Sequence, residues 1–307
     1  MGVLITAAAI CGSIAAGVWA ERRRPAAVGP AARRSLTVVL YTVIPFVVFF
    51  AVARAEVDLE HGVGLALGLV SVAATGLLAW FVCTRVLRLS RPRTGAVLVA
   101  IVSINSVYLG YPLTIALLGR DELATAVLFD VVVCAPSFLL GAFAIGASFG
   151  DRAGETARER LGAFLARNPP LYAALAGLLA PAALAPDLLV DLSQALVIAI
   201  LPVGFFAVGA TLAENAVHGD LPLPPKLTRP VVLAVVMRLA IAPGLLLLLA
   251  APFVDLPAAY LLIAAMPAAV NSLIVANAYG LDMEIVAETI AWSTALVIAA
   301  ALLSLLV

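Results

Sequence analysis

The sequence predicts an all-α integral membrane protein with ten transmembrane helices, arranged as two inverted five-helix repeats. Of its 307 residues, 64% are apolar and 12% are charged, and the mean hydropathy is +1.15. A soluble domain carries about twice that share of charged residues. Because one core cannot hide so much apolar surface, the outside of the fold must face lipid. The apolar runs, the placement of the basic residues and the internal prolines justify each further element of the prediction.

The predicted spans come from hydropathy, because a membrane-spanning helix needs roughly 20 mostly apolar residues. Such runs recur along the whole chain, separated by breaks that contain Arg, Pro or Gly. The positive charges of the first run follow the apolar stretch, so we interpret it as a mature helix rather than a signal peptide. The ten predicted spans cover residues 2–20, 35–53, 62–84, 95–118, 123–148, 169–186, 190–213, 229–251, 257–279 and 284–306.

Basic residues predict the orientation of these spans, because Lys and Arg near helix ends stay on the cytoplasmic side of a membrane. Fifteen of the 18 basic residues fall in the connections after spans 1, 3, 5 and 7. The opposite connections hold only Arg54 and Arg120, and Arg238 lies inside span 8. We therefore expect a multi-pass protein of the plasma (inner) membrane with both termini outside.

The predicted inverted repeat follows from a linker at residues 149–168, which is rich in Gly, Arg and Glu. This cytoplasmic linker separates a first repeat, 1–148, from a second, 169–307. Each repeat holds five spans, and an odd number forces the second to insert upside down relative to the first. Many secondary transporters have this arrangement. Prolines support the duplication, because prolines of spans 2 and 4 recur at nearly the same offset in spans 7 and 9.

Spans 4 and 9 each combine a proline with a buried amide, in the segments INSVYLGYP and AAMPAAVNS. A proline inside a helix removes one hydrogen bond and clashes with the carbonyl four residues earlier, so unpaired carbonyls are expected near Tyr108 and Ile263. Proline is also favoured as the first residue of a helix. Pro112 and Pro267 are therefore predicted to begin the second halves of two broken helices, beside protein or a water-filled cavity.

Two helix amino termini that meet near the midplane form an anion site, because their free N–H groups and dipoles attract negative charge. Neutral side-chain donors there can bind an anion and release it, and Gly110 lets the backbone turn without a Cβ clash. Because Asn105 precedes its proline and Asn271 follows its proline, the two amides are not expected to be symmetry mates. The predicted substrate-binding residues are Asn105, Gly110, Tyr111, Pro112, Pro267, Asn271 and Ser272.

The alternative interpretation of these motifs is structural. The prolines then only kink two helices, and the asparagines hydrogen-bond across the bundle. We favour a binding site, because both motifs occur in corresponding segments of an inverted repeat, where transporters bind their substrates.

Three ionisable residues lie within the spans, where buried charge is costly and marks a functional candidate. Asp130 is interpreted either as a carrier of a proton or cation or as a structural hydrogen-bond acceptor. Arg238 can attract an anionic substrate, but we favour a side chain that extends to the cytoplasmic interface. Glu288 is expected at the interface, while Ser293 and Thr294 are expected to hydrogen-bond to their own helix.

No metal site, cofactor or catalytic centre is predicted. Cys11, Cys83 and Cys134 lie singly in apolar stretches, without the paired spacing of zinc ligands. His61 and His218 lie in polar connections. An intramembrane enzyme needs an activated nucleophile or a metal beside a base, and the spans hold no histidine and only isolated acids. We therefore predict a protein that is not an enzyme.

Three segments are similar to motifs of one known family. They are INSVYLGYP at 104–112, RNPPLYAALAGLL at 167–179 with LPVGFFAVGATL at 201–212, and AAMPAAVNSLIVANAYGLD at 264–282. In these segments the chain resembles the auxin efflux carrier family, which includes plant PIN-type auxin carriers and bacterial malate and malonate carriers. The resemblance spans nearly the whole chain.

The resemblance implies ten helices in two inverted repeats, with helices four and nine broken and crossing at prolines that match Pro112 and Pro267. It also implies a scaffold of helices one, two, six and seven, a moving transport domain of the other six, and small organic acids as substrates. The family's amides match Asn105 and Asn271. The common pattern N-x-G-F-x-G-x-P here has Val107 and Tyr108 at its central positions, so substrate choice cannot be copied from any member.

These observations together predict a secondary transporter of small monocarboxylates or dicarboxylates that works by elevator-like alternating access. The expected partners are a small organic anion, a proton or sodium ion for coupling, membrane lipid and a second copy in a homodimer, with no nucleic acid. The alternatives are a sodium-coupled symporter of the bile-acid type and a cation/proton antiporter. The antiporter is less favoured, because exchange of two protons for sodium requires two carboxylates and span 5 has only Asp130.

Overall fold

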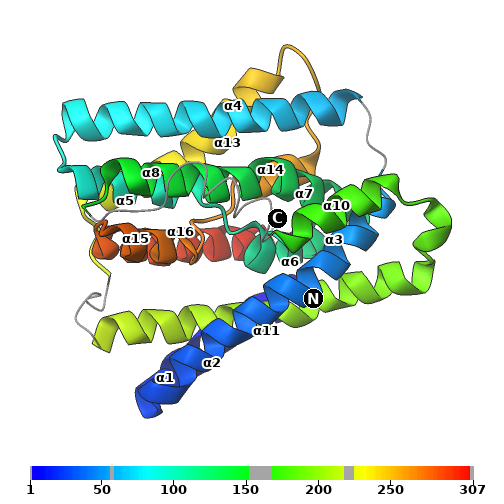
Figure 1. Cartoon of the computed structure of the whole chain (residues 1–307), viewed down its shortest axis with the longest axis horizontal. Coiled ribbons are helices and arrows are strands. Elements are labelled where there is room, and N and C mark those ends of the chain that lie inside the picture. The colour runs from blue at the N-terminus through cyan, green and yellow to red at the C-terminus, as the bar shows by residue number, and fades with distance from the viewer. Residues whose placement is uncertain (1, 56–58, 152–167, 218–224, 305–307) are drawn as a thin grey trace.

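The computed structural model describes residues 2–55, 59–151, 168–217 and 225–304, and within these ranges the chain is helical without β-strands (Figure 1). A single two-residue bridge pairs Ile104 with Ala268. Most of the predicted linker at 149–168, including four of its basic residues, lies outside the described residues.

The described residues from 2 to 151 contain thirteen helical elements, in which the η segments are π-helical turns. They are α1 (Gly2–Arg23), α2 (Pro25–Val38), η1 (Val39–Val43), α3 (Ile44–Ala53), α4 (Leu59–Phe81), η2 (Val82–Val86), α5 (Arg91–Val102), η3 (Ser106–Gly110), α6 (Tyr111–Leu117), α7 (Leu123–Phe129), η4 (Asp130–Cys134), η5 (Ser137–Ala142) and α8 (Phe143–Phe149).

The second part begins after the linker and contains η6 as a short 3₁₀ turn and η7 as a π-helical turn. Its elements are α10 (Pro169–Leu179), η6 (Ala182–Leu184), α11 (Asp187–Val217), α12 (Arg229–Val236), η7 (Met237–Ile241), α13 (Ala242–Ala250), α14 (Ala258–Ala264), α15 (Ser272–Tyr279) and α16 (Met283–Leu303).

Six of the helices in the described ranges are long and apolar enough to cross a membrane. They coincide with predicted spans 2, 3, 5, 7, 8 and 10, which establishes a multi-pass helical membrane protein. The count of ten spans and their inverted order remain predictions. The six helices cover Ala27–Ala53, His61–Val86, Leu123–Phe149, Asp187–Ala207, Arg229–Ala250 and Met283–Leu303.

Two predicted boundaries are wrong, both because of prolines. The second helix begins at Pro25, ten residues before the predicted start, because proline is well suited to the first turn of a helix. Predicted span 6 was expected to reach residue 186, but α10 ends at Leu179. Ala180 is extended there, as expected for a residue that precedes a proline, here Pro181.

The predicted break at Pro112 is also wrong, because the helix continues through this proline. A π-helical turn, η3, ends two residues before it, and within this region the amide of Gly110 donates to Asn105 O at 3.1 Å, five residues back. A wider turn moves the carbonyl that a proline ring would strike, so the helix absorbs the missing donor. Turns η1, η4 and η7 precede Pro45, Pro136 and Pro243 in the same way.

The helices form two contacting groups. Helix α11 packs against α1, α2 and α3, and α10 packs on α3. In the other group α4 packs on α13, α5 on α8 and α16, and α12 on α16. Figure 1 shows α1, α2 and α11 along one side of the molecule, with α4 and α13 on the opposite side and α5, α8, α15 and α16 between them.

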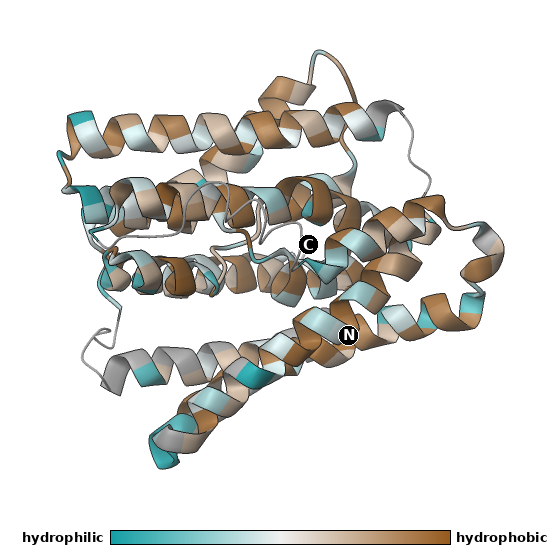
Figure 2. Ribbon diagram, viewed as in Figure 1, coloured by the Kyte–Doolittle hydropathy of each residue, from teal (hydrophilic) through white to brown (hydrophobic). Residues whose placement is uncertain are grey.

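The ribbons are mostly hydrophobic along the length of the helices, and many of the most hydrophilic residues lie near the helix ends (Figure 2). Large apolar side chains on the outside of α4 and α11 are exposed, among them Leu77 and Leu188, which are 65% and 77% exposed. Such side chains need lipid around them, which agrees with the six apolar helices.

Candidate functional site

The central feature of the structure is a pair of helix interruptions that meet inside the protein. The chain leaves helical geometry at Ser103–Asn105, between α5 and η3, and again between α14 and α15. The amide of Asn105 donates to Pro267 O at 2.9 Å, and the amide of Ala269 donates to Ser103 O at 2.9 Å. The two interruptions therefore pair through their backbones, as the sequence predicted in outline.

The second half-helices begin at Ser106 and Ser272 rather than at the prolines, which corrects the predicted starting points. The residue before each start is an asparagine, Asn105 or Asn271, in the N-cap position. The two amides therefore hold equivalent positions, contrary to the expectation that they are not symmetry mates. Neither side chain caps its own helix, so both remain available to a ligand.

Arg238 links the two interruptions through hydrogen bonds from its side chain. The side chain is 1% exposed and does not reach the interface, so the favoured expectation was wrong. Its guanidinium donates to the carbonyls of Met266 at 2.9 Å, of Ile101 at 3.1 Å, and of Ala264. These carbonyls lie at the carboxyl ends of α5 and α14, where a helix leaves acceptors without partners. A buried cation thus satisfies the ends of both half-helices.

Two further hydrogen bonds fix the second interruption. Ser293 on α16 donates to Thr289 O, as predicted, but its Oγ also accepts from the amide of Ala268 at 3.2 Å. The amide of Met266 donates to Ile263 O at 3.1 Å, so the carbonyl that we expected to be unpaired has a partner.

A cavity of about 210 Å³ lies against both interruptions. Its walls come from α2, η1 and α3 on one side, from η4 and η5 on another, and from the first turn of α10 and Gly204 of α11. Most of the lining is apolar, and it contains no Lys, Arg or His within the described part of the chain. Its polar side chains are Tyr41, Asn105, Ser106, Tyr108, Asp130, Asn168 and Asn271.

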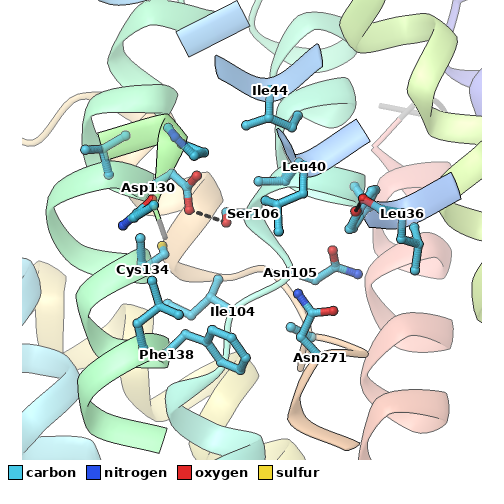
Figure 3. A pocket seen from close by; sticks show the side chains of 18 of the residues that line it. Leu36, Leu40, Ile44, Ile104, Asn105, Ser106, Asp130, Cys134, Phe138 and Asn271 are labelled. Atoms are coloured by element: carbon cyan, nitrogen blue, oxygen red, sulfur yellow. Dashed lines mark hydrogen bonds between the residues drawn. The ribbon is translucent and has the colours of Figure 1, made fainter. Parts of the chain in front are cut away.

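The amides of Asn105 and Asn271 lie close to each other at the cavity wall (Figure 3). Neither side chain has a hydrogen-bond partner among the described residues. Because both amides line the cavity with donors and acceptors that no described protein group uses, this pair is suited to a polar ligand.

The backbone donors of the two half-helices differ, which the sequence did not predict. The amides of Ser106, Val107 and Tyr108 have no partner among the described residues, and all three residues line the cavity. At the other helix the amides of Ser272 to Ile274 already donate to carbonyls three residues back. The helix terminus with free backbone donors at the cavity is therefore that of the Ser106–Leu117 helix.

Asp130 lies in the cavity wall and is 8% exposed. Its Oδ1 accepts from Ser106 Oγ at 2.5 Å, and its Oδ2 accepts from Tyr111 Oη at 2.6 Å (Figure 3). Tyr111 is fully buried and does not line the cavity, so it acts on the cavity only through this carboxylate.

The remaining predicted site residues lie outside the cavity wall. Gly110, Pro112 and Ser272 are buried within the helices, and Pro267 contributes its carbonyl to the pairing of the interruptions. Ser272 Oγ donates to Ala269 O within its own turn. These residues shape the backbone and are not placed to touch a ligand.

Glu288 lies near the first turn of α16, away from the cavity. Its carboxylate accepts from the backbone amide of Lys226 at 2.9 Å, which ties α16 to the segment before α12. The carboxylate of the neighbouring Glu284 accepts a hydrogen bond from Lys226 Nζ at 3.0 Å, and this hydrogen bond raises the pKa of Lys226. These groups form a polar cluster at the helix ends.

Four polar residues of the wall were not predicted from the sequence: Tyr41, Ser106, Tyr108 and Asn168. Tyr108 packs against α11, where a Cβ on Gly204 would lie 2.6 Å from Tyr108 Cδ1, so the glycine makes room for the ring. Asn168 caps α10 by accepting from the amide of Leu171, and the Asn-Pro-Pro sequence is a recognisable start signal for a helix. No motif in the sequence around Tyr41 predicts that this residue lines the cavity. Within the described ranges no cluster of His, Cys, Asp and Glu has the arrangement of a metal site.

This geometry can be compared with known proteins. The profile of the membrane transport protein family matches residues 3–153 and 159–305, nearly the whole chain. The chain belongs to the auxin efflux carrier family of membrane transport proteins. None of the curated proteins matches the chain. As a member of the auxin efflux carrier family it is a multi-pass membrane transporter, in agreement with its apolar helices.

Proposed function

We propose that this carrier is a secondary transporter of small organic acid anions, with the cavity at the paired interruptions as its binding site. The observation that carries the proposal is the set of unpaired donors in one apolar cavity. The side-chain amides of Asn105 and Asn271 and the free backbone amides that follow Ser106 suit a carboxylate. Neutral donors bind an anion without the desolvation cost of a buried ion pair, so they also release it.

The lining favours monocarboxylates with an apolar body over dicarboxylates. Leu36, Leu40, Ile44 and Phe138 cover the cavity around the polar end. A second carboxylate would meet these side chains without a partner, because none of the described lining residues is basic. We therefore expect a carboxylate at the asparagines and an aliphatic or aromatic group against the apolar wall.

The position of the cavity supports alternating access of the elevator type. One wall belongs to α2, α3, α10 and α11, the proposed scaffold, and the other to the interruptions and η4, within the proposed transport domain. Movement of one group against the other would carry the bound anion with the paired interruptions. This division corresponds to predicted helices 1, 2, 6 and 7 against the other six.

The proposed orientation, with both termini outside the plasma membrane, agrees with the polar contacts. Arg93 Nε lies 3.4 Å from Asp282 Oδ2, which joins two connections predicted on the cytoplasmic side. Arg54 Nη2 lies 2.6 Å from Asp187 Oδ1 and joins two connections predicted outside. Coupling to sodium and cation/proton exchange are alternatives that uptake measurements can separate. A homodimer is proposed in addition to either.

The test is binding and uptake by variants of the asparagine pair. Purified protein is screened by thermal shift against phenylacetate, hexanoate and malonate, because a ligand that binds the native state raises its stability. Asn105→Ala and Asn271→Ala should each weaken binding by about ten- to a hundredfold, the loss of one hydrogen bond to a charged group. The matched control is Asn277→Ala, an exposed asparagine on the same helix as Ser272.

Phenylacetate and hexanoate should bind and enter proteoliposomes more readily than malonate. Unchanged uptake in both asparagine variants would overturn the assignment of the site. Uptake that requires sodium at constant proton gradient would instead favour the symporter of the bile-acid type.

A further inference from the structure

The cavity that offers donors to an anion also contains a carboxylate of the protein. Ser106 belongs to both sets, because its backbone amide is free at the helix terminus while its hydroxyl donates to Asp130 Oδ1 at 2.5 Å. Asp130 is 8% exposed and lines the same cavity as Asn105 and Asn271. A bound organic anion would therefore share a small apolar space with this acid.

Two carboxylates in such a space cannot both remain ionised without a large energetic cost. Like charges a few ångströms apart in a weakly polar environment repel strongly, and one of the two then keeps a proton. Among the described residues that line the cavity there is no Lys, Arg or His to offset the second charge. Arg238 is not among the lining residues, and its guanidinium donates hydrogen bonds to three backbone carbonyls.

We propose that the anion binds together with one proton, which Asp130 holds in the cavity wall next to Ser106 and Tyr111. This inference rests on the proposed function and adds its coupling ion. The pair of anion and proton is electrically neutral, so a complete transport cycle, in which the empty carrier returns with Asp130 ionised, moves no net charge. The gradient that drives transport is then the proton gradient.

The two hydroxyl groups supply a mechanism for the coupling. When Asp130 is ionised, both Ser106 Oγ and Tyr111 Oη donate to it. A proton that arrives on Oδ1 turns this oxygen into a donor, and Ser106 Oγ then accepts in place of donating. The serine hydrogen is released toward the cavity, where it can bond to the anion. Protonation thereby removes a repelling charge and adds a donor, with one proton taken up for each anion.

The other titratable groups around Asp130 do not change charge in the same pH range. Tyr111 faces it from α6, Cys134 follows it by one turn, and Tyr41 and Tyr108 lie in the cavity wall. Phenol and thiol groups ionise at about pH 10 and 8.5 in water. Arg238 stays charged. Between pH 5 and 8 the proposed proton therefore belongs to Asp130.

The sign of the pH effect follows from this linkage. Anion binding takes up a proton, so the affinity is highest at low pH and falls as the pH rises, by about tenfold per pH unit where free Asp130 is ionised. Asp130→Asn replaces the acid by a neutral amide that can still accept from one hydroxyl and donate to the other. The variant should bind the anion independently of pH and without proton uptake.

The experiment measures phenylacetate binding by titration calorimetry between pH 5 and 8, in two buffers with different enthalpies of ionisation. The buffer dependence of the heat gives the number of protons taken up. We expect one proton per anion for the unaltered carrier and none for Asp130→Asn. Cys134→Ser, which alters a neighbouring titratable group, should retain one proton per anion. In proteoliposomes, uptake by the unaltered carrier should be insensitive to membrane potential, whereas uptake by Asp130→Asn should respond to it.

Two results would overturn the inference while leaving the proposed function intact. One is pH-independent anion binding without proton uptake in the unaltered carrier, and the other is proton uptake that persists in Asp130→Asn. A failure of phenylacetate, hexanoate and malonate to bind at any pH would reject the proposed function and this inference together.

Discussion

Arg238 offers a direct test of how the two interruptions are held together. Its guanidinium donates to Ile101 O, Ala264 O and Met266 O, and the side chain is fully enclosed. Arg238→Met keeps much of the length of the side chain and removes all three donors. Three buried carbonyls then lose their partners at the ends of α5 and α14.

The magnitude follows from the number of bonds. Hydrogen bonds in membrane proteins contribute about 0.6 kcal/mol on average and up to about 1.7 kcal/mol each, so three contribute about 2–5 kcal/mol. We expect Arg238→Met to lower the free energy of unfolding by about that amount. Because the carbonyls also fix the cavity wall, anion affinity should fall as well.

The assay is equilibrium unfolding of the purified protein with SDS, followed by tryptophan fluorescence. Arg229→Met is the matched control, because this arginine is exposed at the start of the same span. Arg238→Met with unchanged or increased stability would refute the reasoning. Such a result would show that burying the guanidinium costs more than its three hydrogen bonds contribute.

Two further predictions concern residues that position the cavity wall. Gly204→Ala should weaken anion binding, because the new Cβ would lie 2.6 Å from Tyr108 Cδ1, and Tyr108→Ala in the same chain should restore part of the loss; equal affinity for Gly204→Ala and the unaltered protein would contradict the close packing. Ser293→Ala removes the acceptor for the amide of Ala268 and should lower stability by about 1 kcal/mol. Ser304→Ala loses only a local hydrogen bond to Ala301 O at the end of α16 and should have no effect.

The sequence predicts the membrane class because hydropathy and the placement of basic residues are local properties. It also locates the two interrupted segments, since an amide and a proline occur in each. The exact positions of the breaks are harder to predict from the sequence, because a π-helical turn before Pro112 keeps that helix intact. The signal that coincides with the break is the polar Ser-Ile-Asn-Ser sequence that begins at Ser103, whose side chains compete with helical hydrogen bonds.

The role of Arg238 could not be predicted, because its partners are backbone carbonyls that lie between 26 and 137 residues away in the sequence. A long cation near the predicted cytoplasmic side is equally compatible with an interfacial position. The contact between Asp130 and Ser106 likewise depends on how η4 packs against the first interruption. Such pairings depend on tertiary packing, whereas the apolar runs do not.

The most direct test of the anion site is an experimental structure of the carrier with 4-bromophenylacetate, whose bromine can be located by anomalous scattering. The carboxylate should lie within hydrogen-bonding distance of the amides of Asn105 and Asn271, with the bromine against the apolar wall near Phe138. A carboxylate bound elsewhere in the protein, with the asparagine pair unoccupied, would contradict the central claim.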